Sequence, residues 1–155
     1  GPIFYTHTRV GRFGKPFKVY KFRSMENLPT SDLKETKKVT RVGSFIRKTR
    51  IDEIPQLWNV LKGDISLVGP RPETPLLVKE YAEAFPFYNI RHIVRPGLSG
   101  WAQTQQHEVP KFGIDIKQTK TKLAYDMYYL EHSSLLTDIA IMIRTIKVLV
   151  SKSGV

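Results

Sequence analysis

An aspartate and a glutamate stand side by side at Asp52 and Glu53, and arginines precede this carboxylate pair at Arg47 and Arg50. The apolar run that follows the pair has helical spacing, so we expect the pair at the opening of a helix. A helix opening offers unpaired N–H groups and the positive end of the helix dipole, which keep a carboxylate ionised and attract phosphate oxygens. The pair is therefore a candidate reaction centre for a phosphorylated ligand.

The same residues also have a purely structural interpretation. Asp52 can be the N-cap of the helix, or Thr49 can be the cap while Asp52 closes a capping box three residues later. Pro55 fits the first turn of such a helix or a kink, and Gly63 is expected to end it. The local pattern taken alone favours the cap over the reaction centre.

Two further arginines are held by neighbouring prolines. Arg71 lies between Pro70 and Pro72, and Arg95 precedes Pro96 in a turn that also contains glycine. Proline restricts the backbone on both sides, so the guanidinium of Arg71 is presented on a stiff segment. Such an arginine suits a bidentate contact with phosphate or carboxylate, although a plain salt bridge is an equal alternative.

The N-terminal part predicts a β-hairpin, with strands over residues 2–10 and 16–23 and a glycine-containing loop over residues 11–15. Side chains alternate along a strand, so Lys21 and Arg23 point to the same face. They face the ligand in the functional interpretation and form a solvated basic edge in the structural one.

The remaining chain predicts an α+β fold: the hairpin, several short helices around a small core, and a C-terminal amphipathic helix. We expect one domain over residues 1–155, because a chain of this length buries a sizeable core. The expected elements are a loop over residues 26–38, a helix over 42–48, a short strand after 65, a helix over 76–88 that Pro86 ends or kinks, a polar loop over 104–118, and helices from 119 and over 134–150.

The last predicted helix carries an apolar stripe and a basic side. The stripe consists of Leu135, Ile139, Met142, Ile146 and Leu149. The pattern favours packing of this stripe on the core. The alternative is a helix that lies in the membrane interface with its basic residues toward anionic headgroups.

The charge of the chain points to polyanionic partners. There are 25 Lys and Arg residues against 14 Asp and Glu residues, a formal charge of +11, and no cysteine. This balance suits nucleic acid, an anionic membrane surface or phosphorylated substrates. The longest uncharged apolar run near the C-terminus, residues 139–143, is too short to span a bilayer. The four histidines lack the spacing of metal ligands, so zinc is not expected; of them, His92 and His107 are the candidates for a substrate contact.

Several ordered motifs together resemble the bacterial sugar transferase family, the monotopic polyprenyl-phosphate phosphoglycosyl transferases. The matching stretches are residues 1–5, 9–11, 14–17, 20–25, 40–43, 47–58, 63–72, 95–103, 125–129 and 134–138. The resemblance covers nearly the whole chain. It implies a transferase that moves a sugar phosphate from a UDP-sugar to a polyprenyl phosphate such as undecaprenyl phosphate, releases UMP, and initiates the assembly of exopolysaccharides and other glycoconjugates.

The resemblance also implies roles for single residues. It makes Asp52 the nucleophile that forms a covalent phosphosugar intermediate and Glu53 the residue that serves Mg²⁺. Contacts with the substrate and its phosphates are implied at Lys21, Arg23, Arg47, Arg71, Arg95 and Gln103. A dyad without a His or Cys cluster suits Mg²⁺, which usually takes one or two carboxylates together with substrate phosphates and water.

The resemblance also bears on the cellular location of the protein and on the identity of its sugar donor. Family members carry a membrane-inserted segment ahead of the stretch matched here, so we expect a catalytic part that works at the cytoplasmic face of the bacterial inner membrane, with a homo-oligomer among its states. The family pattern is not followed at Thr104, Gln105 and Gln106, which leaves the identity of the donor sugar open.

The competing functional class is a non-enzymatic basic module that binds an anionic membrane or nucleic acid. We do not expect nucleic acid, because the aromatic residues mostly fit apolar faces rather than alternating with basic ones.

Overall fold

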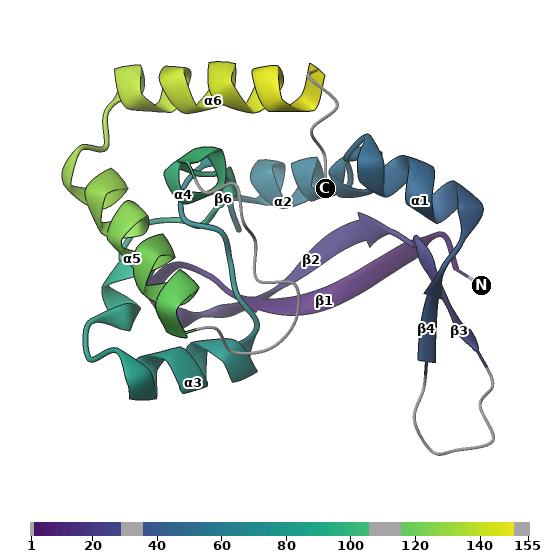
Figure 1. Cartoon of the computed structure of the whole chain (residues 1–155), viewed down its shortest axis with the longest axis horizontal. Helices are drawn as coiled ribbons and strands as arrows, with labels where there is room; N and C mark the ends of the chain where they lie inside the picture. The colour runs from purple at the N-terminus through teal and green to yellow at the C-terminus, as the bar shows by residue number, and fades with distance from the viewer. Residues whose placement is uncertain (1, 29–35, 106–115, 151–155) are drawn as a thin grey trace.

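The computed structural model describes residues 2–28, 36–105 and 116–150, and over these it is the predicted mixture of helices and short strand pairs (Figure 1). Within the described ranges, the strands form three separate two-stranded sheets rather than one continuous sheet. Helices therefore supply most of the framework, and the α+β prediction is confirmed.

The N-terminal hairpin consists of β1 (Phe4–Val10) and β2 (Pro16–Phe22), which pair antiparallel from Phe4 opposite Phe22 to Val10 opposite Pro16. A 3₁₀ turn, η1 (Arg12–Gly14), joins the strands as predicted. Val10 and Val19 are buried, whereas most other side chains of β1 stay exposed. The hairpin therefore packs on the domain through one face near its turn and through the second half of β2.

The loop predicted over residues 26–38 is wrong at both of its ends. Met25–Leu28 forms β3 and Thr36–Val39 forms β4, and the two strands pair antiparallel. Backbone hydrogen bonds hold the two strands together. Such a pair can form without a buried face, so the segment need not show the apolar alternation by which a half-buried strand is predicted. The middle of the predicted loop lies outside the described residues.

Three helical segments follow and carry the carboxylate pair. They are α1 (Arg41–Lys48), the 3₁₀ turn η2 (Ile51–Glu53) and α2 (Gln56–Lys62). The Thr40 hydroxyl caps α1 by accepting a hydrogen bond from the Gly43 amide at 2.8 Å. Gly63 ends α2 in the left-handed conformation at φ 79°, as the sequence predicted.

The centre of the molecule is a parallel pair of short strands, β5 (Ser66–Val68) and β6 (Gly97–Ser99). Between them the chain forms α3 (Pro75–Ala84), which ends before Pro86, and the 3₁₀ segment η3 (Tyr88–His92). A Cβ atom on Gly97 would lie 2.1 Å from the backbone nitrogen of Gly69, so the two backbones approach this closely only because glycine is present.

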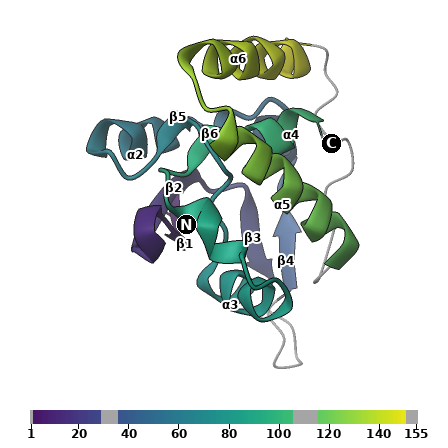
Figure 2. The same ribbon diagram turned by 90° about the vertical axis from the view of Figure 1, so that its left-hand side faces the viewer.

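The C-terminal helices are α4 (Trp101–Gln105), α5 (Ile116–Glu131) and α6 (Leu135–Val150), so the loop predicted over residues 104–118 begins and ends inside helices. Residues 106–115, including His107, lie outside the part of the chain that the structure describes. Helix α6 forms the upper layer in both ribbon views, with α5 beneath it (Figure 2). The core cluster joins Val68, Tyr129 and Ile141, with Trp101, Leu130 and Met142 against it.

The predicted packing of α6 is only partly right. Ile141, which is outside the predicted stripe, is completely buried, whereas Leu135, Ile139, Ile146 and Leu149 of that stripe are exposed. The helix is apolar on more than one side, so periodicity could not identify the side that faces the core. Among the described helices, none combines the length and the apolar composition that crossing a bilayer requires.

Candidate active site

The carboxylate pair lies in η2, the short turn between α1 and α2. Arg50 precedes this turn in the left-handed conformation at φ 58°, an uncommon backbone for arginine that interrupts the helical path between α1 and η2. Thr49 closes the C-terminus of α1, and neither η2 nor α2 has a side-chain cap. The interpretation of Asp52 or Thr49 as a helix cap is therefore wrong.

Glu53 is surrounded by cations from three different parts of the chain. Lys21 Nζ of β2 donates to Oε1 at 2.6 Å, Arg71 Nη2 lies 3.4 Å from the same oxygen, and Arg50 Nη1 lies 3.9 Å from Oε2. Burial alone would raise the pKa of Glu53, but Arg71 and Lys21 outweigh it and lower the pKa to about 2. Glu53 therefore remains ionised at any physiological pH.

Asp52 is 8% exposed and forms no ion pair among the described residues. Burial raises its pKa, an effect that Lys21 opposes and the charge of Glu53 increases. A helix opening was expected to favour the ionised form, but the loss of solvent outweighs that benefit here. The adjacent carboxylates thus have opposite pKa shifts.

The other predicted site residues lie at different distances from this pair. Arg47 is exposed in the last turn of α1 and lowers the pKa of Asp52 through its charge without a direct contact. The Arg23 side chain donates to the Pro2 carbonyl at 2.8 Å, and Arg95 is exposed just before β6. Within the described residues, neither Arg23 nor Arg95 contacts the carboxylate pair. Lys21 and Arg71 are the predicted cations that the fold brings onto Glu53.

Arg50 is the site residue that the sequence-based assignment omitted. Its spacing of three residues to Glu53 is a signal for contact on one side of a helical turn, but the turn here is 3₁₀ and begins with a left-handed residue.

Of the two histidines that were candidates for a substrate contact, His92 lies within the described residues. His92 is buried away from the pair, and burial together with Arg91 lowers its pKa to about 4, so it is neutral.

A buried ionic cluster supports the Arg71 segment from behind. The Arg91 side chain donates to the Arg71 carbonyl at 2.9 Å, to Asp126 at 3.0 Å and to the Tyr88 hydroxyl at 3.0 Å. Burial opposes the charge on Arg91, but Asp126 more than offsets it and raises the pKa of Arg91. Arg9 adds a 3.4 Å hydrogen bond to the Pro72 carbonyl. The stiffness of the proline segment is thus reinforced by contacts to its backbone.

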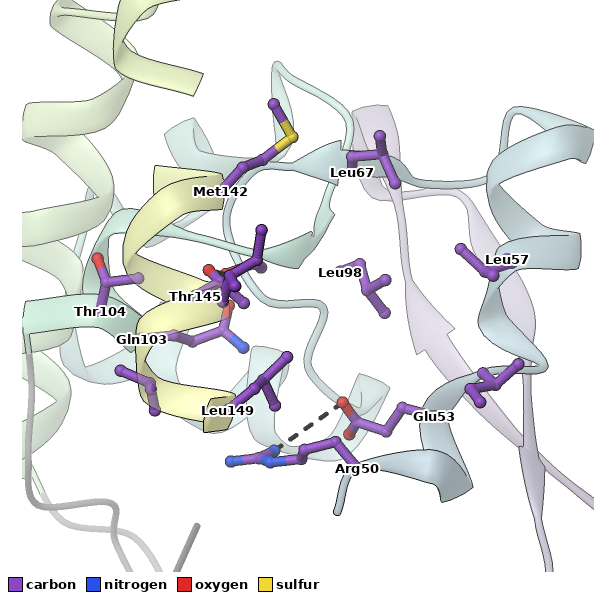
Figure 3. A pocket seen from close by; sticks show the side chains of 14 residues that line it. Arg50, Glu53, Leu57, Leu67, Leu98, Gln103, Thr104, Met142, Thr145 and Leu149 are labelled. Carbon is purple, nitrogen blue, oxygen red and sulfur yellow. Dashed lines mark hydrogen bonds and ion pairs between the residues drawn. The ribbon is translucent and has the colours of Figure 1, made fainter. Parts of the chain in front are cut away.

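A groove of about 380 Å³ opens beside Glu53 (Figure 3). Helix α6 forms one wall and α2 with β5 forms the other, with Leu98 of β6 between them. Its apolar lining includes Ile54, Leu57, Leu67, Leu98, Met142, Ile146 and Leu149. The Arg50–Glu53 ion pair lies at one end, and Gln103, a predicted substrate contact, lines the α4 side.

The donor set suits a hard cation held jointly with a phosphorylated ligand. Within residues 2–28, 36–105 and 116–150 there is no cluster of three His, Asp or Glu side chains that could hold a metal by itself. Glu53 is ionised, and among the described residues its Oε2 has only the 3.9 Å contact with Arg50. A carboxylate with one such oxygen fits the mode in which Mg²⁺ takes one or two protein ligands and completes its shell with phosphates and water.

Comparison with known proteins agrees with these features. Residues 1–152 match the family model described as bacterial sugar transferase. The chain is 44% identical over 159 residues to the UDP-N-acetylgalactosamine-undecaprenyl-phosphate N-acetylgalactosaminephosphotransferase of Aeromonas hydrophila, covering 99% of this chain and 37% of that protein. It is 36% identical over 151 residues to the UDP-glucose:undecaprenyl-phosphate glucose-1-phosphate transferase of Escherichia coli K12, covering 94% of this chain and 32% of that protein.

A shorter relative is the uncharacterized sugar transferase EpsL of Bacillus subtilis, 41% identical over 159 residues, with 97% of this chain and 72% of that protein covered. The chain spans about a third of the length of the first two relatives.

Proposed function

The chain belongs to the bacterial sugar transferase family, and on that premise we propose that it transfers a sugar phosphate from a UDP-sugar to undecaprenyl phosphate and releases UMP. The observation that carries the proposal is the arrangement of charges around the dyad. Glu53 is paired with cations from β2, from the residue before η2 and from the proline segment, whereas the neighbouring Asp52 forms no ion pair with any described residue. Glu53 thus holds the cations in place, and the Asp52 carboxylate is not occupied by an ion pair with them.

Asp52 is the nucleophile in this proposal. A carboxylate oxygen of Asp52 forms a bond to the sugar-linked phosphorus of the donor, the bond from that phosphorus to the UMP oxygen breaks, and UMP leaves. An oxygen of the polyprenyl phosphate then attacks the same phosphorus and breaks its bond to Asp52. The free carboxylate returns, and the sugar diphosphate lipid is the product.

The surrounding cations make a modest nucleophile sufficient. Lys21, Arg50 and Arg71 offset the repulsion between two carboxylates and the donor diphosphate, and they stabilise charge as it moves to UMP. Mg²⁺, held by Glu53 with the substrate phosphates, would further neutralise the diphosphate oxygens when bound. Arg23, Arg47, Arg95 and Gln103 remain predicted contacts for other parts of the substrates.

The acceptor places the reaction at a membrane surface. Exposed apolar side chains gather on α1, α2 and α6, the helices in the upper half of Figure 1, and include Phe45, Trp58, Leu61, Leu135 and Leu136. Together with the charge of +11 they suit contact with anionic lipid. We place the protein at the cytoplasmic face of the bacterial inner membrane, where it would begin the assembly of an exopolysaccharide or related glycan.

The test measures UMP released by the protein at its full natural length with Mg²⁺, a panel of UDP-sugars and undecaprenyl phosphate. We expect release with at least one donor, and a loss on the order of 10³-fold or more in Asp52→Asn. Glu83→Gln, which neutralises an exposed carboxylate of α3, is the matched control and should retain activity. Full UMP release by Asp52→Asn would contradict the nucleophile assignment, and salt-sensitive lipid binding without turnover would favour the non-enzymatic module.

A further inference from the structure

The groove beside Glu53 is charged at one end and apolar along the rest of its length. Its charged residues, Arg50 and Glu53, lie together at one end, and the opposing walls along the rest of the groove are mostly aliphatic (Figure 3). Leu57, Leu67 and Leu149 remain substantially exposed to solvent within it. An exposed apolar surface rimmed by polar residues marks a site that another molecule covers.

The few hydroxyl groups in the groove are already satisfied by the protein. Ser99 Oγ and Thr145 Oγ1 lie 2.6 Å apart and share a hydrogen bond, and Thr145 also donates to the Ile141 carbonyl. Thr104 donates to the Trp101 carbonyl at 2.9 Å. Of the polar side chains that line the groove, Gln103 alone has a buried oxygen without a partner among the described residues. A nucleotide or a sugar would therefore leave most of its own hydrogen-bonding groups unpaired here, which is costly.

The charges at the end of the groove indicate which polar group the ligand carries in addition to its apolar part. Lys21, Arg50 and Arg71 all contact Glu53, so three cations face one carboxylate and an anionic group is favoured beside them. The complementary molecule has an anionic head and an apolar tail. The volume of the groove, about 380 Å³, is within the range of roughly 300–1,000 Å³ that is usual for ligand pockets.

We propose that this groove binds the isoprenoid chain of the acceptor next to its phosphate, and so directs the acceptor phosphate to the carboxylate pair. This inference rests on the proposed function and adds to it the surface that recognises the lipid. The apolar walls of the groove are used in the second step only, because the donor has no isoprenoid chain, whereas Arg50 and Glu53 at its end serve both steps. Loss of the apolar walls should therefore impair transfer to the lipid while formation of the phosphosugar intermediate continues.

Helix α6 offers a matched pair of variants. Ile146 and Ile143 are both 60% exposed on the same helix, but Ile146 lines the groove and Ile143 does not. Ile146→Asp puts a charge into the groove, and Ile143→Asp puts the same charge on the same helix outside it. Any general effect on folding, or on contact between α6 and lipid, should be shared by the two variants.

The first measurement separates the two half-reactions in the protein at its full natural length. For Ile146→Asp we expect an unchanged burst of UMP without acceptor and a KM for undecaprenyl phosphate raised about tenfold or more. Ile143→Asp should leave the ratio of the two half-reactions as it is. Equal acceptor KM values in the two variants would overturn the groove assignment while the burst still supported the proposed function. A missing burst in the unmodified protein would instead contradict the proposed function.

The second measurement tests the groove without turnover, by calorimetric titration of the same protein with farnesyl phosphate and with inorganic phosphate. We expect farnesyl phosphate to bind more tightly than inorganic phosphate, and Ile146→Asp to weaken that binding about tenfold while Ile143→Asp does not. Equal affinity for both probes would overturn the proposal. So would concentration-dependent self-association that Ile146→Asp abolishes without any binding of farnesyl phosphate, because a second copy would then occupy the groove.

Discussion

Two clusters of ionic groups meet at Arg71, one through its side chain and one through its backbone. The dyad cluster consists of Asp52, Glu53, Lys21, Arg50 and Arg71, and its cationic side chains are 25–45% exposed. The buried cluster is centred on Arg91 and Asp126, whose side chains are 1% and 3% exposed. Both contain carboxylates among cations, but solvent reaches the cations on Glu53 and hardly reaches the central pair of the second cluster.

The difference lies in how completely each cluster satisfies its own charges. Arg91 reaches Asp126, Tyr88 and the Arg71 carbonyl, and Lys122 pairs with Glu73, so the charges of the buried cluster are paired inside the protein. In the dyad cluster three cations contact Glu53 and none is paired with Asp52. The buried cluster is suited to hold the Arg71 segment in place, and the dyad cluster is suited to accept an anionic ligand.

The largest effect should come from breaking the buried cluster. Arg91→Met leaves the Asp126 carboxylate buried without its partner, and we expect a loss of about 3–5 kcal/mol in the free energy of unfolding by urea denaturation. Since Asp126 must then be buried as an anion or take up a proton, the loss should shrink as the pH falls.

The double variant Arg91→Met with Asp126→Leu removes both charges and should recover most of the stability. A loss below about 1 kcal/mol in Arg91→Met would mean that the buried cluster resembles a surface ion pair, and the distinction between the clusters would fail.

Breaking the dyad cluster should instead affect activity more than stability. Glu53→Gln leaves Lys21, Arg50 and Arg71 without their shared anion, and we expect UMP release to fall roughly 100-fold. The unfolding free energy should change by less than in Arg91→Met, by about 1–3 kcal/mol, because solvent around the cations reduces the effect of the lowered pKa.

The pH dependence gives a second check on Glu53. Its pKa is lowered to about 2, so its stabilising contribution is complete above its unfolded pKa of about 4.3 and is lost as the pH falls through about 2. Glu53→Gln should therefore differ from the unmodified protein in stability at neutral pH and converge with it below about pH 2. A constant difference at every pH would contradict the ion pairs as its source.

Features that depend on local pattern could be predicted from the sequence. Gly63 ends α2, Thr119 and the residues after it are helical, and the hairpin forms where its glycine-containing loop indicates. The ordered motifs along the chain identified the family, whereas the roles that they imply for Asp52 and Glu53 stay predictions. For the helix end, the helix and the hairpin, the signal lies within a few residues and no distant contact competes with it.

Features that depend on distant contacts could not be predicted. Arg91 and Asp126 are 35 residues apart, and nothing in their spacing indicates a buried pair. Helix α6 carries apolar residues on several sides, so the buried Ile141 was not distinguishable from the exposed Ile146. The direction of the Asp52 pKa shift follows from burial between β2 and α1, which appears only once those elements are placed.

The smallest expected effect is a shift of the acidic limb of the UMP burst, and it separates Asp52 from Glu53. The attacking form of Asp52 is the carboxylate, and its raised pKa means that the burst rate should begin to fall at a higher pH than for an ordinary aspartate. Lys21 is the strongest charge that opposes this rise, so Lys21→Met should move the acidic limb to still higher pH. Glu53 keeps Arg71 and Arg50 in that variant and stays ionised across this range.

Lys18→Met is the matched control for Lys21→Met, because Lys18 is exposed on the opposite face of the same strand and should leave the limb where it is. The measurement is the burst rate from about pH 4 to 8, compared by the position of the limb and not by the height of its plateau. If Lys21→Met moved the limb to lower pH, the group that titrates would not be a carboxylate beside Lys21. The nucleophile would then have to be sought outside the dyad cluster.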